Sequence, residues 1–203
     1  MSHLLNVLLD GFPKEYQGYP INTDFRIGIM LSLLLEDDTI DDEELRLMHA
    51  LTLLYKDKVP EDINLAMSGL YWFLSCGKSE IYYDEDEDND DSSDKSIDFN
   101  VDHLDIWAAF YKLGVDLEQT NMHWFKFCSL LGSLGDCALS QKAQYRTVDL
   151  SDMTGETRKY YAKLKRKYKV RKLISKEEHD AKLKEIESTY GSYYMKLREL
   201  NKK

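Results

Sequence analysis

The sequence has few of the residues that β-rich, secreted or membrane proteins need. It contains only three prolines and ten glycines in 203 residues, too few for the many tight turns of an all-β fold. Its three cysteines are odd in number and widely spaced, so they predict no disulfide framework and favour a reducing compartment. No apolar run approaches the roughly 18 to 20 residues of a membrane helix. The first ten residues carry no basic leader, so we expect no secretory signal.

Hydrophobic residues, in contrast, are plentiful. They make up 43% of the chain, which is enough to bury a core in one domain or in one domain with a small appendage. The net charge of -10 disfavours general nucleic-acid binding, because the phosphate backbone repels an acidic surface.

The charge is divided unevenly along the chain. Residues 158–203 hold 16 basic and 6 acidic residues, whereas the rest of the chain holds 11 basic and 31 acidic residues. The acidic excess is densest at 84–98, where nine carboxylates accompany one lysine. We therefore predict a core domain at 1–150, with a flexible acidic loop at 84–98 that contributes nothing to folding, and a basic C-terminal helical hairpin at 151–203.

Five segments of the predicted core domain carry apolar residues at helical spacing, and they lie at 22–36, 41–56, 60–77, 104–114 and 120–134. Asn22 or Thr23 is expected to cap the first of them, and Thr120 or Asn121 the last. Before them, two prolines and the Gln17-Gly18 pair predict a small hairpin or an extended arm. The predicted fold class is all-α, a helical bundle with a basic C-terminal helical hairpin and a short N-terminal β-hairpin.

Two tryptophans lie on the apolar stripes of these segments, and we predict that both are in the core. Trp107 shares its stripe with Leu104, Ala108 and Tyr111, and Trp124 begins the stripe of the next segment. Aromatic side chains are the largest apolar surfaces available, so their burial is the usual outcome at helical spacing.

No motif in the sequence indicates catalysis or a bound cofactor. The chain lacks a phosphate-binding glycine loop, a paired-cysteine zinc motif and the common metalloprotease and hydrolase signatures. The acidic loop lacks the glycine and the final glutamate of an EF-hand. His123 and Cys128 do not share a helical face, which disfavours a zinc site or a Cys-His nucleophile. We predict no enzyme, no catalytic or metal-binding residue, and no cofactor.

Aromatic and C-terminal residues supply the candidate partner-binding surface. Consecutive aromatic residues cannot all face one side of a helix, so some must face a second layer or a partner. In a last helix beginning near Ser175, apolar residues recur in steps of three and four, which predicts a short coiled-coil seam. The candidate partner-binding residues are Trp72, Phe73, Phe125, Ile186, Tyr190, Tyr193 and Leu197.

Several ordered blocks together resemble a known family. They include Asn22-Thr23-Asp24-Phe25-Arg26, Gly69-Leu70-Tyr71-Trp72-Phe73-Leu74-Ser75-Cys76-Gly77-Lys78, Ile106-Trp107-Ala108-Ala109-Phe110-Tyr111, His123-Trp124-Phe125-Lys126-Phe127 and Tyr145-Arg146. From about residue 21 to residue 168, the chain is similar to small helical proteins encoded in the tail gene module of long-tailed phages and prophages of Gram-positive bacteria. Phe125 departs from the pattern, because a second tryptophan is expected there, but the exchange keeps an aromatic ring.

The resemblance implies a role in assembly. Proteins at this position of the module look like tail assembly chaperones, which hold the tape measure protein soluble before tail tube subunits polymerise around it. By resemblance, the partners are the tape measure protein and the tail tube protein. The protein is then expected in the host cytoplasm and not in the mature virion.

Two other functions stay open at this point. One is a structural tail component, such as a completion or connector protein. The other is a nucleic-acid-binding or regulatory phage protein that acts through the basic C-terminal hairpin, although interleaved acids in that segment favour a protein partner over nucleic acid. The opposite charges of the two parts are also compatible with a homo-oligomer, and we expect no membrane partner.

Overall fold

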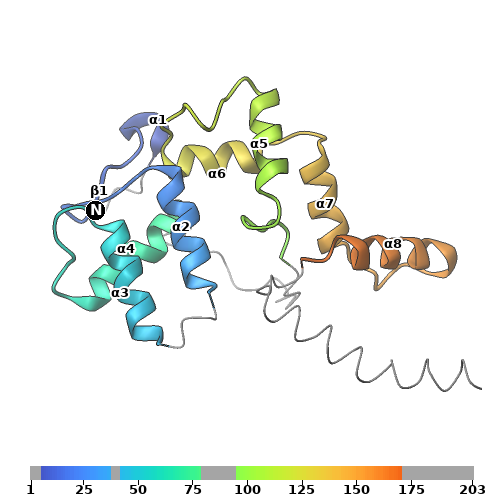
Figure 1. The fold of residues 1–203 in the computed structure, drawn as a ribbon, viewed down its shortest axis with the longest axis horizontal. Helices are drawn as coiled ribbons and strands as arrows, with labels where there is room; N and C mark the ends of the chain where they lie inside the picture. Colours follow the sequence, from blue (N-terminus) through green and yellow to red (C-terminus); the bar gives the residue numbers. More distant parts are fainter. Residues whose placement is uncertain (1–5, 38–41, 79–94, 171–203) are drawn as a thin grey trace, which may run out of the picture. The chain divides into compact units, whose positions relative to one another are not determined.

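The computed structural model describes residues 6–37, 42–78 and 95–170. Within these ranges it consists of α-helices and one two-stranded antiparallel sheet (Figure 1). The helices are α1 (Val7–Asp10), α2 (Phe25–Leu35), α3 (Glu43–Leu54), α4 (Ile63–Leu74), α5 (His103–Lys112), α6 (Trp124–Gly132), α7 (Ala138–Thr147) and α8 (Gly155–Tyr168). The predicted all-α fold with a short N-terminal β-hairpin is confirmed. In the described ranges, we find no helix with the length and apolar character needed to cross a bilayer.

The hairpin pairs β1 (Glu15–Tyr16) with β2 (Tyr19–Pro20). Between them, Gln17 has φ +48° and Gly18 has φ +82°. Two successive positive φ angles match the right-handed twist of a two-residue hairpin, and glycine adopts such an angle at no steric cost. The Gln17-Gly18 pair therefore explains why the chain reverses here.

Helix α2 begins one or two residues later than its sequence predicts. The carboxylate of Asp24 caps it by accepting from the amide of Arg26 at 2.9 Å. The two predicted caps bond elsewhere. The Asn22 side chain donates to the last turn of α3, and the Thr23 carbonyl, which would accept the first helical hydrogen bond if Thr23 were the cap, accepts from the amide of Trp124 at 2.7 Å. Tertiary hydrogen bonds therefore move the start of the helix.

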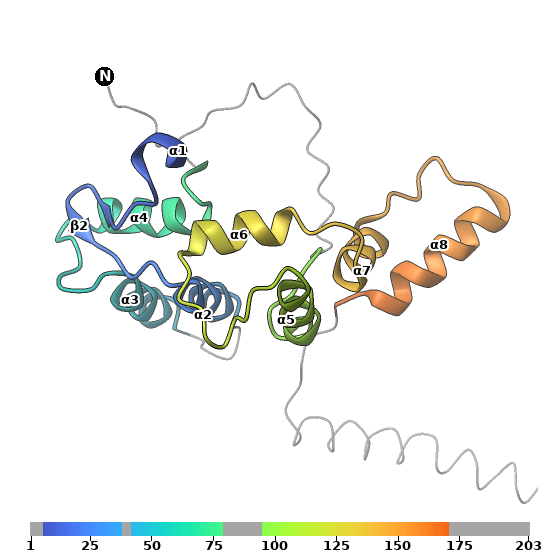
Figure 2. The same ribbon diagram turned by 90° about the horizontal axis from the view of Figure 1, so that it is seen from above.

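The core is mainly aromatic and centres on Phe127 of α6. Its buried ring stacks on Phe25 of α2 and on Phe110 of α5, with 4.9 Å between ring centroids in each pair. The ring of Trp124 lies 5.7 Å from it, and Trp124 is buried as predicted. Figure 2 shows α2 beside α3, with α6 on another side of α2. These rings join α6 to the preceding helix α5 and to α2, which lies far earlier in the sequence.

Gly28 allows α2 to approach the indole ring of Trp124. A Cβ atom at residue 28 would lie 2.2 Å from two ring atoms, and the packed aromatic core leaves the indole no room to move. We expect Gly28→Ala to lower the free energy of unfolding by about 1 to 3 kcal/mol. The matched control is Gly132→Ala, where a Cβ meets nothing within 4 Å. Urea midpoints that do not differ between the two variants would contradict this packing.

Helix α7 is the helix that the sequence pattern did not predict. It carries few apolar residues and buries Leu139 and Arg146. Helix α8 packs against it, and the ring of Tyr145 stacks on Tyr168 with 5.6 Å between centroids. The chain divides into two units, residues 1–169 and residues 170–203. Helix α8 belongs to the first unit. Residues 171–203 lie outside the described part, so the predicted hairpin at 151–203 stays a prediction.

Candidate functional site

The apolar stripe of α5 lies on the outer face of that helix. Leu104, Trp107 and Tyr111 expose 69%, 37% and 59% of their surface. The predicted burial of Trp107 is therefore wrong. Helix α5 is apolar on both sides, so periodicity alone does not choose the buried face. Packing of Phe110 on Phe127 makes that choice and leaves the Trp107 face outside.

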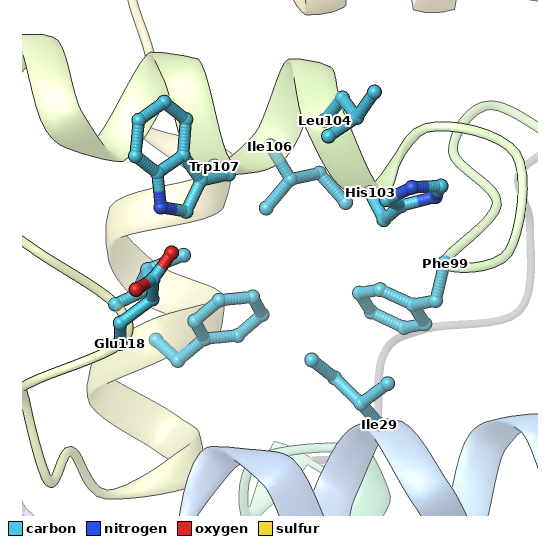
Figure 3. Close-up of a pocket in the computed structure, with 9 residues that line it drawn as sticks. Ile29, Phe99, His103, Leu104, Ile106, Trp107 and Glu118 are labelled. Atoms are coloured by element: carbon cyan, nitrogen blue, oxygen red, sulfur yellow. The ribbon is translucent and has the colours of Figure 1, made fainter.

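An apolar pocket of about 470 Å³ opens beside this stripe (Figure 3). In Figure 3, Ile106 and Trp107 project from α5 towards the pocket, across from Phe99 and from Ile29 of α2. Phe127 contributes to the lining from α6. Because Trp107 belongs to both the stripe and the pocket lining, the two form one continuous apolar surface, which we call the α5 site.

The polar residues of the α5 site lie in its lining without forming a reactive group. His103 and Glu118 line the pocket. The Nδ1 atom of His103 donates to the carbonyl of Asn100 at 2.9 Å. An apolar cavity with few polar groups is typical of a binding site, since apolar contact supplies affinity and the polar groups orient the ligand.

Arg26 of α2 fixes the loop that closes one side of the pocket. Its guanidinium donates to the carbonyl of Leu117 at 2.6 Å and to that of Thr120 at 3.4 Å. The same guanidinium lies 4.5 Å from the ring centroid of Phe25, close enough for a cation–π contact. The loop that carries Leu117 and Glu118 is therefore held against α2.

The start of α5 is held by a buried ion pair. Arg146 of α7 donates to both carboxylate oxygens of Asp102, at 2.6 and 2.9 Å. It also donates to the carbonyls of Ser96 at 2.9 Å and Tyr168 at 2.6 Å. The backbone amide of Asp98 also donates a hydrogen bond to the carboxylate of Asp102, at 2.9 Å. One arginine thus ties together the segment before α5, α7 and the end of α8.

The carboxylate of Asp102 is ionised in this environment. Burial alone raises its pKa, but the hydrogen bonds from Arg146 and from the amide of Asp98 outweigh burial and hold the pKa below its ordinary value. A buried charge is tolerated only where such partners satisfy it. Both side chains are more than nine-tenths buried, so the pair is a structural anchor for the α5 site.

The end of the predicted acidic loop belongs to the same network. Lys95 pairs with Glu36 and, at 3.0 Å, with Asp98. The expectation that the whole of 84–98 contributes nothing to folding is therefore wrong for residues 95–98, because Ser96 and Asp98 bond to the buried ion pair. Residues 84–94 lie outside the described part of the chain.

The predicted partner-binding aromatics lie inside the protein. Trp72, Phe73 and Phe125 expose 5%, 0% and 3% of their surface. The ring centroids of Trp72 and Phe125 lie 5.3 Å apart, and Tyr16 of the hairpin lies 5.0 Å from Trp72. These rings face a second aromatic layer of the same chain. The prediction that these three residues bind a partner is therefore wrong. The other four lie outside the described residues and stay predictions: Ile186, Tyr190, Tyr193 and Leu197.

His123 has a structural role at the start of α6. Its Nδ1 atom accepts from the amide of Phe125 at 3.0 Å, and its Nε2 atom donates to the carbonyl of Pro13 at 2.7 Å. Burial lowers the pKa of His123 more than the bond to Pro13 raises it, so the ring is neutral. Its side chain caps the helix in place of Thr120 or Asn121. Across the ranges that the structure covers, no group of three His, Cys, Asp or Glu side chains is placed to hold a metal.

Helix α8 presents a basic face to solvent. Its half-buried residues include Tyr161, Leu164 and Tyr168, and its exposed cations are Arg158, Lys159, Lys163, Arg166 and Lys167. Like charges on one helix face favour a polyanionic or acidic partner, with an affinity that falls as salt rises. This face is separate from the α5 site in the sequence and in chemistry.

The comparisons with known proteins give one match. Residues 8–170 match the family model described as Bacteriophage Gp15 protein. No curated protein and no solved structure matches the chain.

Proposed function

The chain belongs to the Bacteriophage Gp15 protein family, and from that premise we propose that it is a tail assembly chaperone-like protein that binds a helical segment of the tape measure protein at the α5 site. Membership of this family supports a phage protein of structure or morphogenesis. The finer role rests on the sequence resemblance to tail-module proteins and on the chemistry of the α5 site. The role is one of binding, without a reaction, and takes place in the host cytoplasm.

The observation that carries the proposal is the exposed stripe of α5. Leu104, Trp107 and Tyr111 follow one another at i, i+3 and i+7, and each is exposed. Large apolar side chains gathered on one face of a soluble protein mark an interaction site. Where two helices pack together, the side chains that contact the partner helix recur at this spacing. A helical client therefore fits the stripe better than an extended one.

The stripe is arranged for binding before a client arrives. The rings of Trp107 and Tyr111 stack with 5.1 Å between centroids and an interplanar angle of 14°, so little side-chain freedom is left to lose. Tryptophan and tyrosine are the residues that most often dominate binding energy at interfaces. The pocket beside Trp107 has room for one or two large apolar side chains of the client.

Co-expression with the tape measure protein of the same phage genome tests the proposal. We expect the tape measure protein to stay soluble and to co-purify with this chain. We also expect mass spectrometry to detect none of this chain in mature virions. A chain that is present in virions and does not keep the tape measure protein soluble would instead be a structural tail component. The tail tube protein, tested in the same way, decides whether it is a second partner.

The basic face of α8 favours a second candidate, a phage protein that binds nucleic acid. Its five exposed cations are the observation in favour, and the net charge of -10 is the observation against. Binding of duplex DNA that weakens steeply with rising salt, and that is lost in Lys163→Glu with Arg166→Glu, would support this candidate. If the same double variant still binds the tape measure protein, then DNA binding and tape measure binding use different surfaces.

A further inference from the structure

Two cysteines come together outside the α5 site. Cys76 follows the last turn of α4, and Cys128 lies within α6; both are half-buried free thiols. The two thiols lie close enough for each to act on the pKa of the other. Three residues earlier on each segment, the rings of Phe73 and Phe125 are in contact, with 6.0 Å between centroids. The aromatic layer therefore holds the end of α4 beside α6 at the level of the two thiols.

The local backbone fixes the position of Cys76. Its φ is +57°, and the following Gly77 has φ +81°. The amide of Cys76 bonds to the carbonyl of Phe73 at 3.1 Å, and the amide of Gly77 bonds to that of Trp72 at 2.8 Å. These bonds end α4 in the manner of a left-handed helix cap. The cap turns the chain so that Cys76 meets a residue 52 positions further on.

The two thiols differ in character. The hydrogen bond from Cys128 lowers the pKa of Cys76 against the opposing effect of burial, and the positive charge of Lys78 acts in the same direction. The hydrogen bond with Cys76 and burial both raise the pKa of Cys128. A thiol that ionises more readily, next to a second thiol, is the arrangement of an attacking and a resolving cysteine.

We propose that Cys76 and Cys128 form an oxidisable dithiol, a modification site at which a low-molecular-weight disulfide converts the two thiols into an intramolecular disulfide. The Cys76 thiolate attacks one sulfur of the reagent, whose S–S bond breaks and releases a thiolate. Cys128 gives its proton to solvent and attacks the Cys76 sulfur of the mixed disulfide, which releases the second thiolate. The protein loses two electrons, and the reagent takes them up as two thiols.

The new bond joins the end of α4 covalently to α6. Helix α6 also supplies Phe127 to the lining of the α5 site, so oxidation stiffens one wall of that site. A cross-link that closes a loop of about 50 residues stabilises the fold by restricting the unfolded chain. The inference does not depend on the proposed function, since it concerns thiols that the α5 site does not use.

The test uses the full chain carrying Cys137→Ser, which removes the third thiol. Cys137 caps α7 through its side chain, and serine is a favourable residue at that position. The reduced protein is incubated with oxidised glutathione and measured by intact-mass and peptide mass spectrometry. We expect a product lighter by about 2 Da, a Cys76–Cys128 cross-linked peptide, and a melting temperature about 5 to 10 °C higher.

A matched variant separates the roles of the two thiols. With Cys128→Ser added, Cys76 has no resolving partner, and we expect it to keep one glutathione, an increase of about 305 Da. Two glutathiones on the chain that retains both thiols, or no reaction there, would overturn the proposal. An unmodified Cys76 in the Cys128→Ser variant would overturn the assignment of Cys76 as the attacking thiol.

Discussion

Replacing Arg146 with alanine is expected to lower the free energy of unfolding by about 3 to 5 kcal/mol. The substitution leaves the carboxylate of Asp102 buried without its cation, and it also removes the donors to the carbonyls of Ser96 and Tyr168. Three segments lose their common anchor at once. Urea unfolding followed by circular dichroism measures the loss.

A second ion pair between the same two helices provides the control. Lys142 of α7 pairs with Asp105 of α5, but their side chains are 31% and 27% exposed, so water replaces the contact when it is lost. We expect Lys142→Ala to cost less than about 1 kcal/mol. Equal losses for Lys142→Ala and Arg146→Ala would contradict a special role for the buried pair.

The pH dependence gives a further check on the same residue. The folded pKa of Asp102 lies below its ordinary value, so its contribution is present above about pH 4 and is lost as the pH falls through the folded pKa. In the Arg146→Ala variant, the pKa of Asp102 depends only on burial and on the hydrogen-bond donors that remain. Protonation then relieves an unpaired buried charge, so the difference in stability between wild type and variant should shrink below about pH 4.

Truncating Trp124 to alanine is expected to cost about 3 to 5 kcal/mol. Its indole is 3% exposed and packs against Phe73, Phe99 and Phe127. Among the residues that the structure describes, the buried Nε1 atom has no hydrogen-bond partner, so the loss comes from packing and from the cavity that is left.

Trp107→Ala is the matched control for Trp124→Ala. Its side chain lies at the surface of α5, and we expect a cost of less than about 1.5 kcal/mol. The two variants are compared by their urea midpoints under the same conditions. A loss for Trp107→Ala as large as that for Trp124→Ala would place Trp107 in the core and remove the central feature of the α5 site.

Local sequence signals predicted much of the fold. Helical spacing located α2 to α6, the Gln17-Gly18 pair located the hairpin, and Trp124 was correctly placed in the core. These features depend on neighbours a few residues apart, which is the range over which periodicity and turn chemistry act.

The features that define the site depend on contacts distant in the sequence. Asp102 and Arg146 are 44 residues apart, and nothing in the polar sequence of α7 marks Arg146 as buried. Helical periodicity identifies the apolar stripe of α5, but the orientation of the stripe depends on the contact of Phe110 with Phe127 of another helix. The burial of Trp72 and Phe125 likewise follows from their contact with each other. Only tertiary packing decides such cases.

The affinity of purified chain variants for a soluble helical segment of the tape measure protein tests the α5 site most directly. The site variant is Leu104→Ser with Trp107→Ser. The control is Leu45→Ser with Met48→Ser on α3, two exposed apolar residues at the same spacing. Isothermal titration calorimetry should show affinity reduced at least about 30-fold by the site variant and less than about threefold by the control. Wild-type affinity in the site variant, with circular dichroism confirming that it is folded, would contradict the account.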